Sequence, residues 1–378
     1  MIAAVLAPVL AIAGAAVWTW RLHQLAVRRR ESARTTGRDA SVPRVSIVVP
    51  ARDEASTLPR LLASLRALEP PAHEIIIVDD HSSDATADIA RAAGAIVVAA
   101  PDLPSGWCGK PWACQAGAAL ATGELVLFSD ADTVHGPSSL ADAVAEMERT
   151  RAELVSVVPT HEAQDVWEHA QGAFQLLLAI ATRAGASADR AGSRRFAIGQ
   201  YLLFRREAYA RIGGHASVRD RVAEDLALAT RVVETGGRYH VACVPGLVRV
   251  RMYTSPLAFA RGWRRSFRDG MSAAGPVASI EIALVMACVL GAPLAAVIAL
   301  GSGAWFAGAA WSLAAIAIGV DIARRQRVVG DFAWWGVLGY PVAALAFVAI
   351  SAASLVDTLL RRPVVWRGRA IAPTRVPR

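Results

Sequence analysis

Two aspartates follow directly after a run of apolar residues that is typical of a buried strand. The run covers residues 125–128, and Asp130 and Asp132 come after it with one small residue between them. A chain that turns at the end of a strand can bring both carboxylates to one point. Carboxylate oxygens bind hard divalent cations, which in turn hold the phosphates of a substrate. The pair therefore suggests a Mg²⁺ or Mn²⁺ site, although in an isolated Asp-x-Asp the acids are more often solvated loop residues.

Polar side chains also follow two other predicted strands, at residues 45–49 and 74–78. They are Arg52, Asp53 and Glu54 after the first strand, and Asp79 and Asp80 after the second. Acids in such places can instead cap helix N-termini, and Asp84 fits that role for the helix that follows it. Capping explains Asp80 and Asp130 less well, because they stand just after strands rather than directly before helices.

Short apolar runs alternate with helix-like segments across residues 44–255, which we expect to form the catalytic domain. Strands are predicted at residues 45–49, 74–78, 95–98 and 125–128, and helices at 58–68, 86–93, 112–122 and 226–234. This alternation is typical of βαβ units, whose mostly parallel sheet is covered by helices on both faces. Ligands of such sheets bind beyond the carboxyl ends of the strands, so the strand-end acids are expected to share one rim. The predicted fold class is α/β, with transmembrane helices at both ends of the chain.

The composition indicates membrane segments outside this middle region. Hydrophobic residues make up 54% of the 378 residues and charged residues only 19%, which is too apolar for a wholly soluble protein of this length. Residues 1–20 are predicted to be a transmembrane anchor, because residues 2–20 carry no charge and are long enough to cross a bilayer. A signal peptide carries its basic residues before the apolar run. Here the arginines come after it, so we expect an uncleaved anchor with a cytoplasmic C-terminal end.

Two to three further spans are expected within residues 279–360. An apolar block at residues 282–320, interrupted around residue 302, predicts a hairpin, and residues 332–360 form a third candidate. The anchor and three later spans would place both ends of the chain on the same side of the membrane. The arginines instead place the start outside and the tail inside. Either the segment around Pro341 re-enters without crossing, or the tail lies outside.

The remaining charge pattern follows the membrane. Residues 21–43 are predicted to be a basic linker and residues 361–378 a basic tail, and much of the net charge of +8 lies beside the spans. Such arginines favour the anionic cytoplasmic leaflet. Nucleic acid is not an expected partner, because no nucleic-acid-binding motif accompanies the charge. The four cysteines lack metal or disulfide spacing, which indicates a reducing compartment. The histidines, among them His135, show no ligand-like clustering and are expected at the surface or in structural roles.

The middle region carries an ordered set of motifs. They are Val48-Val49-Pro50-Ala51-Arg52-Asp53-Glu54, Val78-Asp79-Asp80-His81-Ser82-Ser83-Asp84-Ala85-Thr86, Gly106-Trp107-Cys108-Gly109-Lys110, Asp130-Ala131-Asp132, Gly199-Gln200-Tyr201, Gly213-Gly214-His215 and Ala223-Glu224-Asp225. In this order over residues 45–270, the set resembles the family-2 inverting glycosyltransferases of GT-A fold. It looks most similar to the membrane-anchored branch that includes carotenoid- and hopanoid-associated enzymes. The resemblance implies a nucleotide-sugar donor, with a UDP-sugar expected, and a divalent metal as cofactor, Mg²⁺ or Mn²⁺.

The resemblance also implies roles for individual residues. The expected nucleotide-sugar site consists of Pro50, Arg52, Glu54, Asp80, Lys110 and Asp130. Asp80 would accept the uracil N–H, and Lys110 would lie near the nucleotide phosphates. Asp130 and Asp132 would contact the ribose and the metal. Asp225 would be the catalytic base.

Chemistry supports a base at Asp225 independently. An acceptor hydroxyl that attacks an anomeric carbon must lose its proton as the bond forms, and a positioned carboxylate can take that proton. The leaving nucleoside diphosphate gains charge, which a metal neutralises. Without the resemblance, Glu224 and Asp225 would more simply be solvated acids at the N-terminus of the helix predicted at residues 226–234, where the helix dipole favours them.

One stretch departs from the family pattern. Many relatives, especially processive synthases, carry Gln-x-x-Arg-Trp after the base, whereas this chain has Arg261-Gly262-Trp263-Arg264-Arg265. Trp263 could still form the floor beneath the acceptor, with Arg264 or Arg265 on the diphosphate. Gln200 and Glu224 are further candidates on the acceptor side.

The same stretch has a second interpretation of equal weight. Phe259, Trp263 and Phe267 recur at every fourth position with arginines around them, which is typical of a helix lying on a bilayer surface. Residues 256–278 are therefore predicted to be an interfacial amphipathic segment, and one helix could serve both purposes.

These features predict a membrane-bound glycosyltransferase that moves a sugar to a lipid or isoprenoid-type acceptor with inversion. Its expected location is the cell (inner) membrane, as a multi-pass protein with a cytoplasmic catalytic domain. A processive polysaccharide synthase is the first alternative, disfavoured by the missing Gln-x-x-Arg-Trp and the small number of spans. A transporter or flippase is the second. Ionisable residues inside spans usually mark transport paths, but here Glu281, Asp321 and Asp357 lie at span edges.

Overall fold

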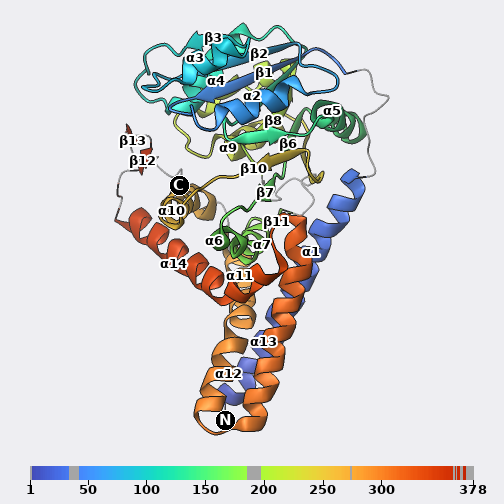
Figure 1. Cartoon of the computed structure of the whole chain (residues 1–378), viewed down its shortest axis with the longest axis vertical. Helices are drawn as coiled ribbons and strands as arrows, with labels where there is room; N and C mark the ends of the chain where they lie inside the picture. Colours follow the sequence, from blue (N-terminus) through green and yellow to red (C-terminus); the bar gives the residue numbers. More distant parts are fainter. Residues whose placement is uncertain are drawn as a thin grey trace. The chain divides into compact units, whose positions relative to one another are not determined.

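The structure is a computed structural model of the chain and describes residues 2–33, 42–184, 197–272, 275–360, 362, 364–366 and 369–371. The chain divides into two compact units, which Figure 1 shows coloured along the sequence. The sheet unit consists of residues 29–160, 187–252 and 361–378. The helical unit consists of residues 1–28, 161–186 and 253–360. Residues 161–186, which we assigned to the catalytic domain from the sequence, therefore pack with the helical unit.

A seven-stranded sheet with strand order β3-β2-β1-β4-β8-β6-β9 forms the centre of the sheet unit (Figure 1). The strands are β1 (Val45–Ala51), β2 (Glu74–Asp79), β3 (Ile96–Ala99), β4 (Leu125–Ser129), β6 (Leu154–Val157), β8 (Tyr201–Arg205) and β9 (Tyr239–Ala242). Strands β1 to β4 pair in parallel, as do β6 and β9, whereas β8 runs antiparallel to β4 and β6. The prediction of a mostly parallel sheet is confirmed. The antiparallel strand β8 is a feature that the sequence pattern did not reveal.

Helices cover both faces of this sheet, because its strands bury alternate side chains in two cores. Ile47 of β1 faces a core with α2 (Leu58–Arg66) and α5 (Ser139–Thr150). Val48 faces the opposite core, with α4 (Gly109–Leu120) and α9 (Glu224–Glu234). This two-sided burial is expected of a sheet whose strands read as continuous apolar runs. The other elements of the unit are α3 (Thr86–Ala92), β5 (Thr133–His135), α8 (Arg206–Arg211), the 3₁₀ helix η1 (Gly214–Val218), β10 (Val248–Val250), β12 (Val364–Trp366) and β13 (Arg369–Ile371).

The helical unit is built from long apolar helices with short connecting elements. It contains most of α1 (Ile2–Ala33) and β7 (Thr160–Glu162), together with α6 (Val166–His169), α7 (Gln171–Ala181), α10 (Pro256–Ser272), α11 (Gly275–Val289), α12 (Gly291–Gly301), α13 (Trp305–Arg325), η2 (Gln326–Val328), β11 (Gly330–Asp331), η3 (Trp334–Gly339) and α14 (Tyr340–Leu359). Among the described residues, three helical stretches are long and apolar enough to cross a membrane: Val277–Gly301, Trp305–Val328 and Trp334–Leu359.

Helix α1 is longer than the predicted anchor. It continues to Ala33, through most of the segment predicted to be a linker, because residues 21–33 contain no proline or glycine that would end it. The side chains of residues 1–7 lie outside the described part of the chain. The N-terminal anchor therefore stays a prediction.

The aromatic face of α10 is buried inside the helical unit. Phe259, Trp263 and Phe267 are each less than a tenth exposed. Their rings lie 4.8 to 6.0 Å from the ring of Phe174 in α7, and Phe267 also lies 5.3 Å from Phe347 in α14. This packing contradicts the expectation that α10 rests with this face on a bilayer surface, because other helices already cover the face. The four-residue spacing indicated amphipathicity correctly, but not what covers the apolar side.

Candidate functional site

The two aspartates after β4 lie in a tight turn that leads into β5. The hydroxyl of Thr133 donates to the carbonyl oxygen of Asp130 at 2.8 Å and closes the turn. Oδ1 of Asp132 is buried without a hydrogen-bond partner among the described residues. Burial, followed by the charges of Asp130 and Glu54, raises the pKa of Asp132 to about 7. The turn thus holds a partly buried carboxylate, one oxygen of which has no hydrogen-bond partner among the described residues.

Lys110 reaches this turn from the first turn of α4. Its Nζ atom lies 2.7 Å from Oδ1 of Asp130 and 2.8 Å from Oε1 of Glu224, the first residue of α9. Burial alone would lower the pKa of Lys110, but the attraction of Asp130 and Glu224 outweighs it and holds the pKa well above its ordinary value. Lys110 is also the only lysine among the 40 basic residues of the chain. Its ammonium is a compact point charge that joins the acid after β4 to the acids of α9.

The carboxylate of Asp225 belongs to the same cluster. It accepts the backbone N–H of Gly199 at 2.8 Å and that of Leu226 at 2.8 Å. Burial, and then the charge of Glu224, raises the pKa of Asp225 to about 7, while Lys110 acts in the opposite sense. A Cβ atom at position 199 would lie 3.1 Å from Nζ of Lys110 and 3.2 Å from Oε1 of Glu224, so glycine allows this close approach. The structure therefore brings the α9 acids to the acid after β4.

The loops after β1 and β2, beside this cluster, are hydrogen-bonded to each other. Asp53 and His81 adopt left-handed φ angles of 54° and 57°. The carboxylate of Asp53 accepts the backbone N–H of Ser83 at 2.7 Å, and the backbone N–H of Asp53 donates to Oγ of Ser82 at 3.0 Å. Non-glycine residues rarely adopt such angles, and they persist only where surrounding contacts enforce them. The hydrogen bonds across the two loops hold this edge of the sheet in one shape.

Arg52 and Asp80 present complementary polar groups on these loops. Nη1 of Arg52 lies 3.6 Å from Oδ2 of Asp80, which is an ion pair beyond hydrogen-bond length. Nε and Nη1 of Arg52 are buried without hydrogen-bond partners among the described residues. Unsatisfied donors beside a buried carboxylate suit a planar ring that carries both carbonyl oxygens and an N–H.

The remaining predicted donor-side residues lie in the sheet unit as well. Pro50 is within β1, paired in register with Val78 of β2. The carboxylate of Glu54 accepts the hydroxyl of Thr57 at 2.6 Å. Gln200 is buried next to Gly199, at the start of β8.

Three predicted acceptor-side residues, Trp263, Arg264 and Arg265, lie on α10 in the helical unit. Trp263 is part of the aromatic cluster of that unit, and its Nε1 has no hydrogen-bond partner among the described residues. The guanidinium of Arg264 donates to both carboxylate oxygens of Asp357, at 2.5 and 2.7 Å. The positive charge of Arg264 is thus engaged within its own unit.

A buried polar network beneath the aspartate turn was missed in the sequence. Nε2 of His135 lies 2.9 Å from Oγ of Ser129, which lies 3.0 Å from Oγ1 of Thr133. The hydroxyl of Ser129 also reaches the carbonyl oxygen of Gln200 at 3.5 Å. Burial lowers the pKa of His135 to about 3, so the ring is neutral. The signal was the small polar residues at 129 and 133 and the histidine at 135, which flank the two aspartates directly after a strand that is buried throughout.

The residues around the turn fit a divalent cation. Among the described residues no group of three or more ligating side chains is assembled for a metal ion. However, Oδ1 of Asp132 is a buried oxygen without a partner, and the charges of Asp130 and Glu54 act on the same carboxylate. A hard cation would relieve both the missing partner and the repulsion. Asp130 and Asp132 are the residues that would hold it.

Comparison with known proteins identifies the domain. Residues 46–213 match the family described as Glycosyl transferase family 2. This region is therefore similar to a family-2 glycosyltransferase domain. The match agrees with the family predicted from the motifs, over a region that contains Lys110, Asp130 and Asp132 and ends before α9.

Curated relatives agree with this assignment. A 4,4'-diaponeurosporenoate glycosyltransferase of Staphylococcus haemolyticus (strain JCSC1435) is 27% identical over 254 residues, which cover 64% of this chain and 66% of that protein. A protein of the same name from Staphylococcus aureus (strain N315) is 28% identical over 268 residues, covering 69% of this chain and 70% of that protein. The chain thus spans about two thirds of the length of these relatives.

A solved structure supports the fold. The mannosyltransferase PcManGT from Pyrobaculum calidifontis, in complex with GDP-Man and Mn2+, superposes with a TM-score of 0.54 at 19% identity. The match covers 93% of this chain and 99% of that chain. At this identity the likeness concerns the fold alone, and it confirms the predicted GT-A architecture.

Proposed function

We propose that this protein is a membrane-bound, inverting glycosyltransferase that moves a sugar from a nucleotide sugar, with a UDP-sugar expected, to an isoprenoid-type lipid acceptor. One observation carries the proposal. The single lysine of the chain joins Asp130, at the carboxyl end of β4, to Glu224, next to Asp225 at the start of α9. A donor-side acid and an acceptor-side acid therefore stand at one place, as a single displacement at an anomeric carbon requires.

Each residue of the cluster has a task in this reaction. Asp225 takes the proton of an attacking hydroxyl, and its raised pKa of about 7 makes it a stronger base than an ordinary carboxylate. Lys110 supplies positive charge next to the position expected for the diphosphate. Arg52 and Asp80 offer donors and an acceptor to the nucleobase. The fastened loops after β1 and β2 keep these groups in place before the donor arrives.

Asp130 and Asp132 would hold a divalent metal ion. When bound, such an ion neutralises charge that develops on the leaving diphosphate. The chain's own contribution is the uncompensated carboxylate of Asp132, buried in a turn that Thr133 closes.

The acceptor class follows from the relatives and from the helical unit. Both relatives are named for 4,4'-diaponeurosporenoate, whose name denotes a carboxylate. Three helical stretches of this chain are long and apolar enough to cross a bilayer, which suits an acceptor dissolved in lipid. We therefore propose a hydroxyl or carboxylate on a long apolar isoprenoid as the acceptor. We also propose that the sheet unit works on the cytoplasmic face, where nucleotide sugars are present.

A donor screen on membranes tests this function. Membranes containing the full chain are incubated with UDP- and GDP-sugars and Mn²⁺, released UDP or GDP is measured, and the lipids are analysed by mass spectrometry. We expect one donor to release its nucleotide and one lipid to gain the mass of one sugar. Membranes with Asp132→Asn at equal expression are the matched control, because this change should abolish metal-dependent turnover with a hydroxyl or a carboxylate acceptor. Equal release from both preparations with every donor would contradict the proposal, and a ladder of added sugars would instead favour a processive synthase.

A further inference from the structure

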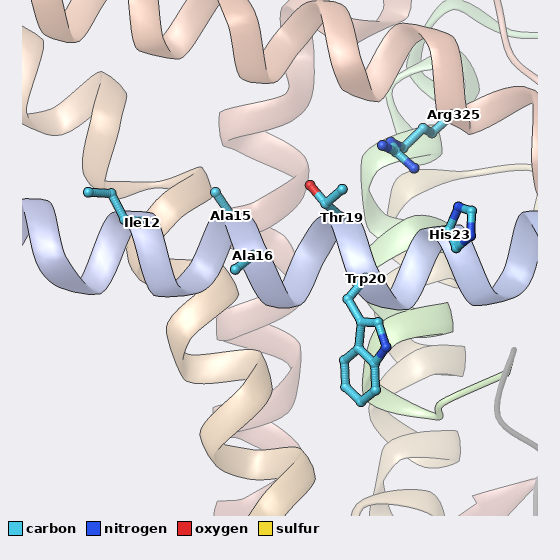
Figure 2. A pocket seen from close by; sticks show the side chains of 7 residues that line it. All are labelled: Ile12, Ala15, Ala16, Thr19, Trp20, His23 and Arg325. Atoms are coloured by element: carbon cyan, nitrogen blue, oxygen red, sulfur yellow. The ribbon is translucent and has the colours of Figure 1, made fainter.

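The outward face of α1 carries a groove that the proposed reaction does not use. The cavity has a volume of about 620 Å³ and is closed on one side by Arg325 of α13 (Figure 2). Its other lining residues all belong to α1: Ile12, Ala15, Ala16, Thr19, Trp20 and His23. They recur at intervals of three and four positions, so they share one face of the helix.

The opposite face of α1 is packed against the helical unit. A Cβ atom at Gly14 would collide with the backbone of Leu284 in α11, so the two helices touch there. Trp18 is buried, and its Nε1 donates to Oδ2 of Asp321 in α13 at 2.6 Å. These contacts fix which face of α1 points outward. The groove is therefore a persistent feature of that face.

The groove has an apolar end and a basic end. Ala15 and Ala16 line the cavity with small side chains, and Figure 2 shows them between Ile12 and Trp20 along the axis of α1. At the far end, Figure 2 shows the guanidinium of Arg325 on the side of α13 that faces α1. A ligand that fits both ends carries an apolar chain and an anionic head.

Arg325 keeps donors for such a head. Its Nε donates to Oδ2 of Asp321 at 2.7 Å, which fixes the side chain. A guanidinium has five N–H groups, so four remain on its two terminal nitrogens, in the geometry that phosphate oxygens prefer. The side chain is a quarter exposed, which leaves it accessible from the groove.

The length of the groove matches one leaflet of a bilayer. From Ile12 to His23 the helix rises roughly 16 Å at 1.5 Å per residue. The hydrocarbon core of a bilayer is about 30 Å thick, so the acyl chains of one leaflet fill about half of it. The basic end lies toward Arg28, Arg29 and Arg30 in the last turns of α1, which the charge rule places in the cytoplasm. Anionic phospholipids are enriched in that leaflet.

We propose that this groove binds one anionic phospholipid of the cytoplasmic leaflet, with its phosphate on Arg325 and an acyl chain over Ala15 and Ala16. The proposal rests on the proposed insertion of α1 in the membrane. It does not depend on the transferase reaction, because none of the lining residues belongs to the acid cluster of the sheet unit. A lipid in this place would seal the outward side of the contact between α1 and α13.

Native mass spectrometry of the full chain tests the proposal. The protein is extracted from vesicles of equal parts phosphatidylglycerol and phosphatidylcholine, and the retained lipids are counted. We expect one lipid per chain, with phosphatidylglycerol preferred by about fivefold, the preference that one arginine near the surface provides. Arg325→Gln should remove this preference. Arg324→Gln, the same charge change on an exposed neighbour that does not line the groove, should retain it.

A second variant avoids any loss of folding caused by disturbing Asp321. Ala16→Phe fills the floor and leaves all charges in place, so retention of either phospholipid should fall. Ala309→Phe, on an exposed part of α13 outside the groove, is its control. Equal retention in Ala16→Phe and Ala309→Phe would overturn the proposal, as would an equal effect of the two arginine changes. Retention of an isoprenoid instead of a phospholipid would also overturn it and would identify the groove as an acceptor site. Loss of transferase activity with lipid retention unchanged would concern the proposed function alone.

Discussion

The two units of this protein differ in whether their partly buried acids all have an ionic partner. In the helical unit, the three acids at the ends of apolar stretches all face arginines. The pairs are Glu281 with Arg21 and Arg183, Asp321 with Arg325, and Asp357 with Arg264. In the sheet unit, as far as the structure describes it, Oδ1 of Asp132 has no hydrogen-bond partner and Asp225 accepts backbone N–H groups alone, and the pKa of each rises to about 7.

This difference indicates that the paired acids of the helical unit stabilise the fold, whereas Asp132 and Asp225 of the sheet unit take part in function. Removing one partner of a buried ion pair leaves the other uncompensated, so such pairs hold helices in one arrangement. A transport path requires ionisable groups that remain available to the solute, and paired acids do not meet that need. Uncompensated carboxylates, by contrast, cost stability in the empty protein and gain partners when a ligand binds. We therefore expect changes in the sheet unit to alter chemistry and changes in the helical unit to alter folding.

The largest effect is expected for Asp132→Asn, which should abolish metal-dependent turnover. An amide oxygen carries no charge to hold the cation, whereas the fold should survive, because Oδ1 of Asp132 has no hydrogen-bond partner among the described residues that the change would remove. Nucleotide release is measured over a Mn²⁺ titration, with Asp88→Asn on the surface of α3 as the control. Wild-type turnover that is unchanged in EDTA would show that the metal assignment is wrong.

Asp225→Asn should lower turnover with a hydroxyl acceptor by about 10²- to 10⁴-fold, the usual contribution of a general base. Donor affinity should hardly change, because Asp225 is assigned to the acceptor side. A carboxylate acceptor is already ionised near neutral pH, so its transfer should suffer much less. Rates with both acceptor types, and the donor Kd, measure these effects. If donor binding is lost while turnover at saturating donor is kept, Asp225 belongs to the nucleotide pocket and Glu224 becomes the first candidate for the base.

Much of the sheet unit could be predicted from its sequence. Strands β1, β2 and β4 lie within one or two residues of the expected positions, because each is a short apolar run followed by polar residues. Boundaries were less predictable where they matter for the site. Helix α4 begins at Gly109 rather than near Trp112, since proline is tolerated in a first turn, and this places Lys110 in the helix. Helix α9 likewise begins at Glu224 and includes both acids in its first turn.

Contacts between distant segments could not be predicted. The antiparallel strand β8 inserts between β4 and β6 and carries Gly199 and Gln200 to Asp225 and Ser129, a pairing that no local pattern encodes. The aromatic face of α10 had a clear helical period, but the period says nothing about whether lipid or protein covers it. The acids of the candidate site could be predicted from the sequence. Which side chains contact them, and which of them have no partner among the described residues, could be found only in the structure.

A third prediction concerns stability, which the loss of an ion pair in the helical unit should lower and the loss of the Asp132 charge in the sheet unit should raise. Glu281→Gln leaves two arginines of the helical unit without their carboxylate, so the protein should lose about 3 kcal/mol of stability. Glu148→Gln removes an exposed pair with Arg205 and should change stability by less than about 1 kcal/mol. Thermal unfolding in one detergent measures both.

Asp132→Asn should instead stabilise the metal-free protein. The folded-state pKa of Asp132 is raised to about 7 from the ordinary value of 3.8, so its ionisation opposes folding. The cost is absent below about pH 4, grows as the pH rises and is complete above about pH 7. The gain in Tm from Asp132→Asn should follow the same course. A loss of Tm at pH 8 in EDTA would contradict the difference between the two units.

The pH profile of the reaction gives a smaller but more specific effect. A base must be deprotonated, and burial together with Glu224 raises the pKa of Asp225 to about 7. With a hydroxyl acceptor, kcat/KM should therefore fall about tenfold per pH unit below this value, rather than only below the ordinary carboxylate range near pH 4. Asp225→Asn should lose this acid limb. A limb that persists unchanged in the variant would assign the titration to another group.

The smallest expected effect concerns His135, which touches neither donor nor acceptor and acts through Ser129 on the aspartate turn. His135→Ala removes the buried acceptor or donor of Ser129, so the turn loses a contact that holds it, and Mn²⁺ affinity should weaken about tenfold. His135→Gln offers an amide within reach of the same hydroxyl and should recover most of that affinity. Turnover at saturating Mn²⁺ should stay close to wild type in both variants, because the ligands themselves are intact. A mainly structural role would lower Tm and the maximal rate together and leave the midpoint of the Mn²⁺ titration unchanged. If this midpoint is the same in His135→Ala, His135→Gln and wild type, His135 does not position the site.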